Sequence, residues 1–162
     1  MTTTKTIIVS GTPGTGKTTL AKKLAKHMKY KYIDVNKVIE QHDLTEGYDK
    51  ERDSKIVPIN KLKAKLKAII KETPNTIIDS HLSHYLPKSI IKTCIITKCN
   101  LKELESRLKK RKYKKAKIRE NLDAEIFDIC LNEAQEKGHK IVIIDTSTKY
   151  SITNIINRLR IN

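Results

Sequence analysis

The chain has 162 residues, with 34 Lys and Arg against 18 Asp and Glu, so its formal net charge at pH 7 is +16. This length suits a single domain, residues 1–162, because domains commonly hold about 100–200 residues. Hydrophobic residues make up 38% of the chain, which excludes wholesale disorder. No apolar run approaches the about 20 residues of a membrane helix, and no signal-peptide pattern is present. We therefore expect a soluble, cytoplasmic protein.

Cysteine usage and charge narrow the range of ligands. Cys94, Cys99 and Cys130 form no CxxC pair, so they indicate neither a disulfide framework nor a zinc site. The positive excess predicts anionic ligands, either nucleotides or a polyanion such as RNA. The alternative is a solvated lysine surface without a partner, since most of the positive residues are Lys and Arg binds phosphate better.

Predicted strands and helices alternate along the chain. Short β-branched runs predict buried strands at residues 5–10, 30–34, 76–79, 92–97 and 140–145. Apolar residues three or four apart predict helices at residues 20–28, 59–70, 101–108, 118–137 and 151–160. Between the second strand and the second long helix, residues 35–56 form a polar excursion with one short helix near residues 35–41. Strands separated by helices predict a parallel sheet with helices on both faces, a three-layer α/β fold.

The decisive motif is the stretch at residues 11–18 (GTPGTGKT), which matches GxxxxGK[ST] in full. A buried strand precedes it and an amphipathic helix follows it, which is the context that a phosphate-binding loop requires. Small residues there let backbone N–H groups turn towards a phosphate, and the helix adds the positive end of its dipole. We expect Lys17 to reach the β- and γ-phosphates and the Thr18 hydroxyl to bind Mg²⁺.

A magnesium ion at this loop also needs a carboxylate. Asp79 ends a predicted strand, where ligands of open α/β sheets bind. Asp34 and Asp145 end strands as well and are alternatives. The motif Asp79-Ser80-His81 favours Asp79, because it places a titratable imidazole two residues on. We expect a structural role for His84, further along the same loop.

The most basic stretch is residues 109–117 (KKRKYKKAK). One interpretation is a solvated helix face, as in most charge runs. We favour a short lid that brings a cation over a transferring phosphoryl group, a role that Arg111 can fill. Arg107 lies one helical turn before Arg111, so both could face the same side.

The order of these motifs resembles one family. The segments GTPGTGKTT, YIDV, EGYDKERD, IDSHLSHYLP, RLKKRKY and ENLDAEIFDI are similar to those of the atypical adenylate kinases of the isoenzyme-six type, over about residues 5–150. The resemblance implies a P-loop nucleoside monophosphate kinase core with strand order 2-3-1-4-5. It also implies a short acceptor-binding insertion at about residues 34–57 and a lid at about residues 110–120.

The resemblance also assigns roles by position. ATP phosphates would be held by Gly14, Gly16, Lys17, Thr18 and Thr19. Asp79 and His81 would form an Asp-x-His pair, Arg111 would be the lid arginine, and Lys149 would lie near the adenine. Where this chain has Lys112 the family often has Gly, and Leu82 replaces another common Gly.

Three functions follow as hypotheses. The first is an Mg²⁺-dependent enzyme that transfers phosphate from ATP to AMP or another nucleoside monophosphate. The second is an ATPase that assists small ribosomal subunit maturation, with a platform ribosomal protein and rRNA as partners. The resemblance implies both activities on one chain. A small-metabolite kinase is a third alternative, although the insertion carries only one arginine, Arg52, where a carboxylate substrate would need a cluster.

Overall fold

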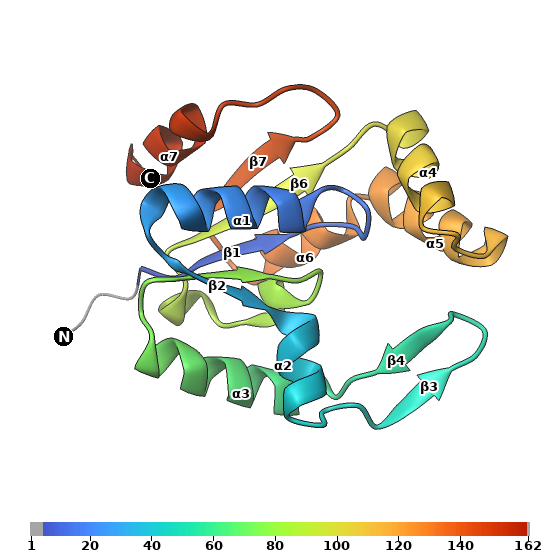
Figure 1. The fold of residues 1–162 in the computed structure, drawn as a ribbon, viewed down its shortest axis with the longest axis horizontal. Helices are drawn as coiled ribbons and strands as arrows, with labels where there is room; N and C mark the ends of the chain where they lie inside the picture. The colour runs from blue at the N-terminus through green and yellow to red at the C-terminus, as the bar shows by residue number, and fades with distance from the viewer. Residues whose placement is uncertain (1–4, 162) are drawn as a thin grey trace.

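The computed structural model describes residues 5–161 and centres on a parallel sheet (Figure 1). Its strands, β1 (Ile7–Ser10), β2 (Lys31–Asp34), β5 (Thr76–Asp79), β6 (Thr93–Lys98) and β7 (Ile141–Asp145), lie in the order β2-β5-β1-β6-β7. Counted within this sheet alone, that order is 2-3-1-4-5, as the family resemblance implied. The labels differ only because β3 and β4 belong to a separate hairpin.

Helices cover both faces of the sheet, which confirms the three-layer α/β fold. On one face, Ile7 and Val9 of β1 pack with α1 (Lys17–Met28) and α7 (Ile152–Ile161). On the other face, Ile8 packs with residues of α2 (Val35–Gln41), α3 (Ile59–Glu72) and α6 (Ile129–Glu136). Successive strand residues point to opposite faces, so an unbroken apolar run is what a strand buried on both sides requires.

The polar excursion contains a small hairpin that the sequence did not predict. Strands β3 (Gly47–Asp49) and β4 (Ser54–Ile56) pair antiparallel, and we call residues 47–56 the hairpin arm. Each strand has only three residues, none of them buried, so no alternation of buried and exposed positions marks them. The short helix predicted just before them is confirmed as α2.

One predicted helix was wrong in its extent. Residues 118–137 do not form one long helix, because α5 (Lys115–Ile126) ends before α6 begins. Between them Asp128 adopts a left-handed backbone conformation, with φ 50°. The Lys98 ammonium group forms ion pairs with Glu125 and Asp128 at this corner. Apolar spacing continues across the break, so the turn depends on a contact with β6 that is distant in sequence.

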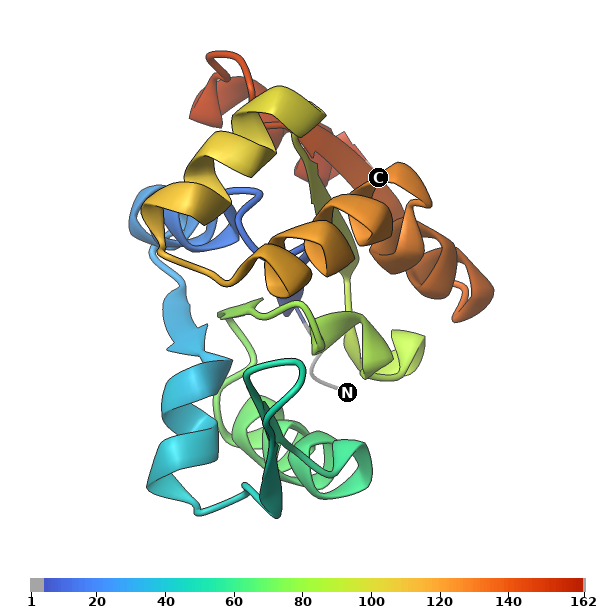
Figure 2. The same cartoon turned by 90° about the vertical axis from the view of Figure 1, so that its right-hand side faces the viewer.

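Helix α4 (Leu101–Lys110) is capped by Asn100, whose side chain accepts a hydrogen bond from the Glu103 N–H, and it packs against α5. Figure 2 shows α4 and α5 above the hairpin arm, on one side of the molecule. Two 3₁₀ turns, η1 (Ser83–Tyr85) and η2 (Lys88–Ile90), lie between β5 and β6. Within residues 5–161, no helix is long and apolar enough to cross a membrane.

Candidate active site

The phosphate-binding loop, residues 11–18, connects β1 to α1 and is held by the core beneath it. Gly11 has a φ of 141°, and a Cβ there would lie 2.7 Å from the Thr97 carbonyl oxygen, so only glycine fits. Thr15 Oγ1 donates to the Thr12 carbonyl at 2.6 Å and also lies 2.6 Å from Thr97 Oγ1. Helix α1 begins after Gly16 with no side-chain cap, which leaves its first N–H groups for an anion.

Lys17 lies at the base of the loop. Its ammonium group donates to the carbonyl oxygens of Gly11 at 2.9 Å and Thr12 at 3.0 Å. Desolvation lowers the pKa of Lys17 to about 8, while the nearby Asp79 carboxylate acts in the opposite direction. The group is therefore still mostly protonated at pH 7, and a phosphate that replaced the two carbonyls would gain a poorly solvated cation.

Asp79 stands beside the loop at the end of β5, as the sequence predicted. Its Oδ2 accepts hydrogen bonds from Thr18 Oγ1 at 2.6 Å and from the Tyr32 hydroxyl at 2.8 Å. Burial, followed by the bond to Asp79, raises the pKa of Tyr32, so this phenol remains a donor. No motif indicated Tyr32, because it reaches Asp79 from the neighbouring strand β2, 47 residues away in sequence.

The two alternative carboxylates have local roles. Asp34 caps α2 by accepting a hydrogen bond from the Asn36 N–H at 2.9 Å. Asp145 accepts the Ser147 N–H at 2.8 Å, and bonds to Ser147 lower its pKa. Asp34 lines the cleft, but only Asp79 contacts the Thr18 hydroxyl among the three.

These donors fit a magnesium ion. Mg²⁺ is usually held by one or two protein oxygens, with phosphates and waters completing its shell, and does not need a cage of carboxylates. Thr18 and Asp79 supply a hydroxyl and a carboxylate side by side at the loop. No cluster of three His, Cys, Asp or Glu side chains suited to a metal occurs within the part of the chain that the structure describes.

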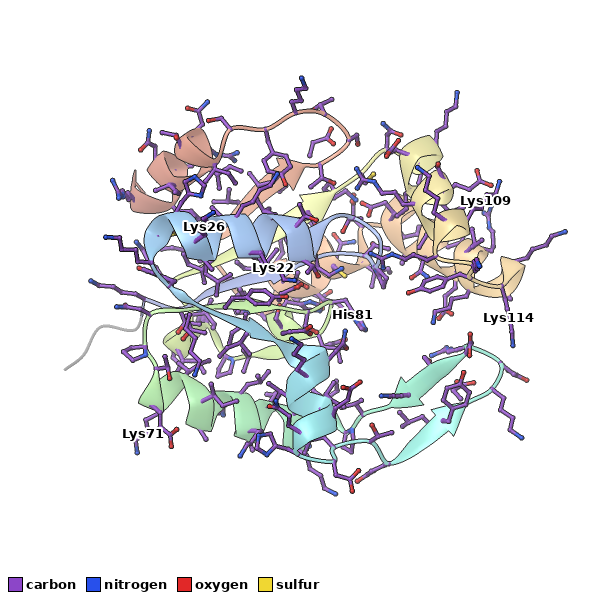
Figure 3. The ribbon with its side chains drawn as sticks, in the orientation of Figure 1. Lys22, Lys26, Lys71, His81, Lys109 and Lys114 are labelled. Atoms are coloured by element: carbon purple, nitrogen blue, oxygen red, sulfur yellow. The ribbon has the colours of Figure 1, made fainter. Side chains whose placement is uncertain are left out.

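His81 follows β5 and lines the same cleft (Figure 3). His81 is exposed to the cleft, but surrounding protein atoms displace part of the water around its imidazole. Desolvation and the positive charge of Lys17 lower its pKa to about 4. The imidazole is therefore neutral at pH 7, and it can accept or donate one hydrogen bond without adding charge.

His84 has the structural role that we expected. It is buried, with Nδ1 2.7 Å from Ser10 Oγ and Nε2 2.5 Å from a carboxylate oxygen of Glu133. Burial lowers its pKa, although Glu133 counteracts part of this effect. The imidazole thus connects α6 to the strand that leads into the phosphate loop.

Residues of the predicted lid reach the cleft from the other side. Arg111, Tyr113 and Lys117 line it, but Arg107 does not. The Arg107 guanidinium instead donates to the Thr146 carbonyl at 2.9 Å and to the Gly14 carbonyl at 3.4 Å. The expectation that both arginines face the same side was wrong, because Arg107 braces α4 against the phosphate loop and the end of β7.

The backbone at Lys112, in the predicted lid, accounts for the glycine of the family pattern. Lys112 has a φ of 58°, a left-handed conformation that glycine adopts without cost. The turn geometry is therefore kept here with a lysine. Leu82 stands at the other position where the family commonly has glycine. It has a negative φ, so no glycine is needed there.

Together these elements enclose a cleft of about 580 Å³. Of the predicted residues, those that line it are Gly14, Gly16, Lys17, Thr18, Thr19, Asp79, His81 and Arg111. Lys149 is exposed in the loop after β7 and is not among the lining residues. The hairpin arm adds Arg52 and Ser54, and the acidic Glu120 lines the cleft from α5.

Comparisons with known proteins identify relatives of this chain. Residues 7–128 match the family described as "AAA domain". The chain is 35% identical to a Methanocaldococcus jannaschii protein named "Putative adenylate kinase" over 153 residues, 94% of this chain and 82% of that one. It is also 35% identical, over 94% of this chain and 79% of the other, to the Saccharomyces cerevisiae protein named "Adenylate kinase isoenzyme 6 homolog FAP7".

Two solved structures share the fold. Shikimate kinase from Acinetobacter baumannii, in complex with shikimate, has a TM-score of 0.66 at 12% identity and covers 98% of this chain and 92% of its own. The enzyme of the same name from Bacteroides thetaiotaomicron has a TM-score of 0.58 at 18% identity, with 96% of both chains covered. At such low identity the likeness concerns the fold alone.

Proposed function

The chain belongs to the adenylate kinase family of the isoenzyme 6 type, and we propose on this basis that it transfers the γ-phosphoryl group of ATP to AMP with Mg²⁺. The observation that carries the proposal is that one cleft gathers the required groups. Loop residues Lys17 and Thr18, the carboxylate of Asp79 and the lid cation Arg111 all line it. Membership makes the protein a phosphotransferase that uses a nucleotide; the acceptor and the metal are the proposed parts.

The phosphate loop would hold the donor. Backbone N–H groups at the start of α1 and the Lys17 ammonium group face the β- and γ-phosphates in this arrangement. Thr18 and Asp79 are the residues that would bind Mg²⁺, which supplies positive charge to the phosphate oxygens when it is bound. The exposed Lys149 is proposed to approach the adenine.

The acceptor needs little acid–base help. Its phosphate has a second pKa of about 6 and is already largely ionised at pH 7. The chain therefore has to position the acceptor oxygen in line and stabilise charge on the transferring group, a task that suits Arg111 and Lys17. His81 is neutral at pH 7 and suits orientation better than proton removal, because a base whose pKa is about 4 binds a proton weakly.

A paired assay with ATP and Mg²⁺ tests the proposal. ADP is measured with AMP present, and phosphate release is measured with AMP absent. We expect ADP formation that depends on AMP and is lost in Lys17→Met. ADP formation independent of AMP, with matching phosphate release, would contradict the kinase assignment.

A second role rests on the charge. The surface carries most of a net charge of +16, and Figure 3 shows labelled lysines on α1 (Lys22, Lys26), at the end of α3 (Lys71) and around the lid (Lys109, Lys114). Positive charge on these several elements supports contact with a polyanion such as rRNA. In this role the chain would bind a platform protein of the small ribosomal subunit and couple ATP turnover to maturation.

Salt dependence tests the RNA contact. Neutralisation of several phosphates makes affinity fall steeply with salt, by about 10³–10⁵ between 50 and 200 mM for 6–10 contacts. We expect measurable binding of a structured RNA at low salt and a steep loss. Binding that is absent at low salt, or insensitive to salt, would return these lysines to a solvated surface.

A further inference from the structure

A chain of hydrogen bonds runs from the wall of the cleft to the base of the phosphate loop, and the proposed reaction does not yet use it. Glu133 of α6 lines the cleft, and its Oε2 lies 2.5 Å from Nε2 of the buried His84. On the other side of this ring, Nδ1 lies 2.7 Å from Oγ of Ser10. Ser10 is fully buried at the end of β1 and directly precedes Gly11, the first residue of the loop.

These groups fix one another's hydrogen-bond roles. A carboxylate oxygen only accepts, so the N–H of His84 that donates to Glu133 is on Nε2. Burial lowers the pKa of His84, and the charges of His139 and Lys137 act in the same direction, while the contact with the carboxylate offsets only part of this effect. The imidazole is therefore neutral at pH 7 and carries a single N–H, which leaves Nδ1 as an acceptor. The Ser10 hydroxyl then has to donate to Nδ1.

The turn that carries His84 is anchored to the same part of the molecule by other bonds. Ser83 Oγ donates to the Val9 carbonyl of β1 at 3.3 Å, and His139 Nε2 lies 2.9 Å from the His84 carbonyl oxygen. His81 lies three residues before His84, in the same connection after β5. The ring of His84 thus lies between the start of the phosphate loop and the segment that brings His81 to the cleft.

We propose that Glu133 is a positioning residue of the phosphoryl-transfer site and acts through His84 and Ser10. Its carboxylate holds His84 in the Nε2–H tautomer, and this tautomer holds the Ser10 hydroxyl in one orientation at the base of the loop. The Tyr85 hydroxyl donates to the same Oε2 at 3.1 Å and helps to keep this oxygen beside His84. The kinetic part of the assignment rests on the proposed function, whereas the tautomer does not depend on it.

The tautomer is tested first, in a long-range proton–nitrogen NMR spectrum of the whole chain at pH 7, with His84→Gln to identify the signals of this ring. We expect the unaltered chain to show the Nε2–H form alone. In Glu133→Gln the amide can donate to Nε2 as well as accept from it, so the Nδ1–H form should appear. An unaltered chain in the Nδ1–H form, or a ring that Glu133→Gln leaves unchanged, would overturn the proposal.

The same variants are then compared by ADP formation from ATP and AMP. In Glu133→Gln we expect kcat to fall about 3- to 10-fold, equivalent to one lost hydrogen bond, with both KM values within about 2-fold. Positioning acts on kcat because misplaced groups weaken the transition state more than the bound substrates. Ser10→Ala removes the other end of the chain and should give a similar loss. The double variant should lose no more than the larger single loss, because both substitutions act through one ring.

Glu136→Gln is the matched control, since it removes the same charge from an exposed position about one turn later on α6 that does not line the cleft. Its kcat and the spectrum of its His84 ring should match those of the unaltered chain. Melting temperatures check folding. If Ser10→Ala does not fold, Glu133→Gln carries the test alone, because its side chain is 33% exposed and its replacement leaves no cavity in the core.

The outcomes separate the two levels of the proposal. If the unaltered chain forms no ADP from AMP, the proposed function fails and the positioning role falls with it. If ADP forms but Glu133→Gln raises KM for AMP at unchanged kcat, Glu133 binds the acceptor directly and only the positioning role is overturned. Additive losses in the double variant would also overturn it. A merely structural network would lower the melting temperature of Glu133→Gln without changing the tautomer of His84.

Discussion

On the phosphate-loop wall of the cleft, Thr15 and Lys17 bond to the loop's own backbone and Asp79 accepts two short hydrogen bonds. On the opposite wall, the hairpin arm and α5 meet through exposed side chains such as Arg52 and Glu120. The first wall is an extension of the core, and the second is a surface contact. The phosphate-loop wall is therefore pre-organised for an anion, whereas the side chains of the opposite wall can change partners at low energetic cost.

Lys17→Met is the strongest test of the phosphate-loop wall. We expect kcat for ADP formation to fall about 100- to 1000-fold, comparable to the loss of one pre-organised donor to transition-state charge. The melting temperature should not fall, because a cation with a lowered pKa is replaced by an apolar side chain. Lys26→Met, on the exposed side of α1, is the control and should keep full activity. A small loss of kcat in Lys17→Met would mean that the loop backbone suffices.

Asp79→Asn tests whether the phosphate-loop wall also binds Mg²⁺. The half-saturating Mg²⁺ concentration for ADP formation should rise by at least about 10-fold, as is usual when a metal site loses one of its oxygen ligands or their supports. Asp145→Asn removes the alternative carboxylate at another strand end and should leave the Mg²⁺ dependence unchanged. An equal shift in both variants would make the effect one of general charge.

His81→Ala probes the junction of the two walls. If His81 orients water, phosphate release without AMP should fall about 10-fold or more while ADP formation with AMP falls less. Equal losses would make it a positioning residue for both reactions.

Because the pKa of His81 is about 4 in the folded chain and 6.5 as a free side chain, the unfolded chain binds more protons between these values. The contribution of the neutral imidazole to stability is thus present above pH 6.5 and lost as the pH falls towards 4, and the melting temperature of His81→Ala should fall less over that window.

Lys112→Gly tests the turn between α4 and α5, which leads into the opposite wall, and it has the smallest expected effect. Glycine relieves the left-handed conformation, so the free energy of unfolding should rise by about 0.5–1 kcal/mol in a denaturant titration. Lys109→Gly, in the last turn of α4, is the control and should lower it by a similar amount. A loss of stability in Lys112→Gly would show that this turn needs the lysine side chain.

Much of the fold is encoded in local sequence patterns. Runs such as IIVS (residues 7–10) and TIID (residues 76–79) predict strands buried on both faces, and the structure confirms them as β1 and β5. Sequence patterns did not predict the hairpin arm, because its three-residue strands show no alternation of buried and exposed residues. Sequence patterns did not predict the helix break at Asp128 either, because its ion pair with Lys98 joins residues 30 positions apart.

The sequence by itself located the phosphate loop, the carboxylate of Asp79 at a strand end and the cation Arg111 in the predicted lid, because spacing and strand ends locate such groups without knowledge of their neighbours. The structure brings all of them to one cleft. Only the tertiary structure decided that the Tyr32 hydroxyl fixes Asp79, that Arg107 braces the loop from outside the cleft, and that Arg52 meets Glu120. These contacts join strands and arms far apart in the chain. Their partners are chosen by the order of strands in the sheet and by the packing of α4 and α5, which no local pattern carries.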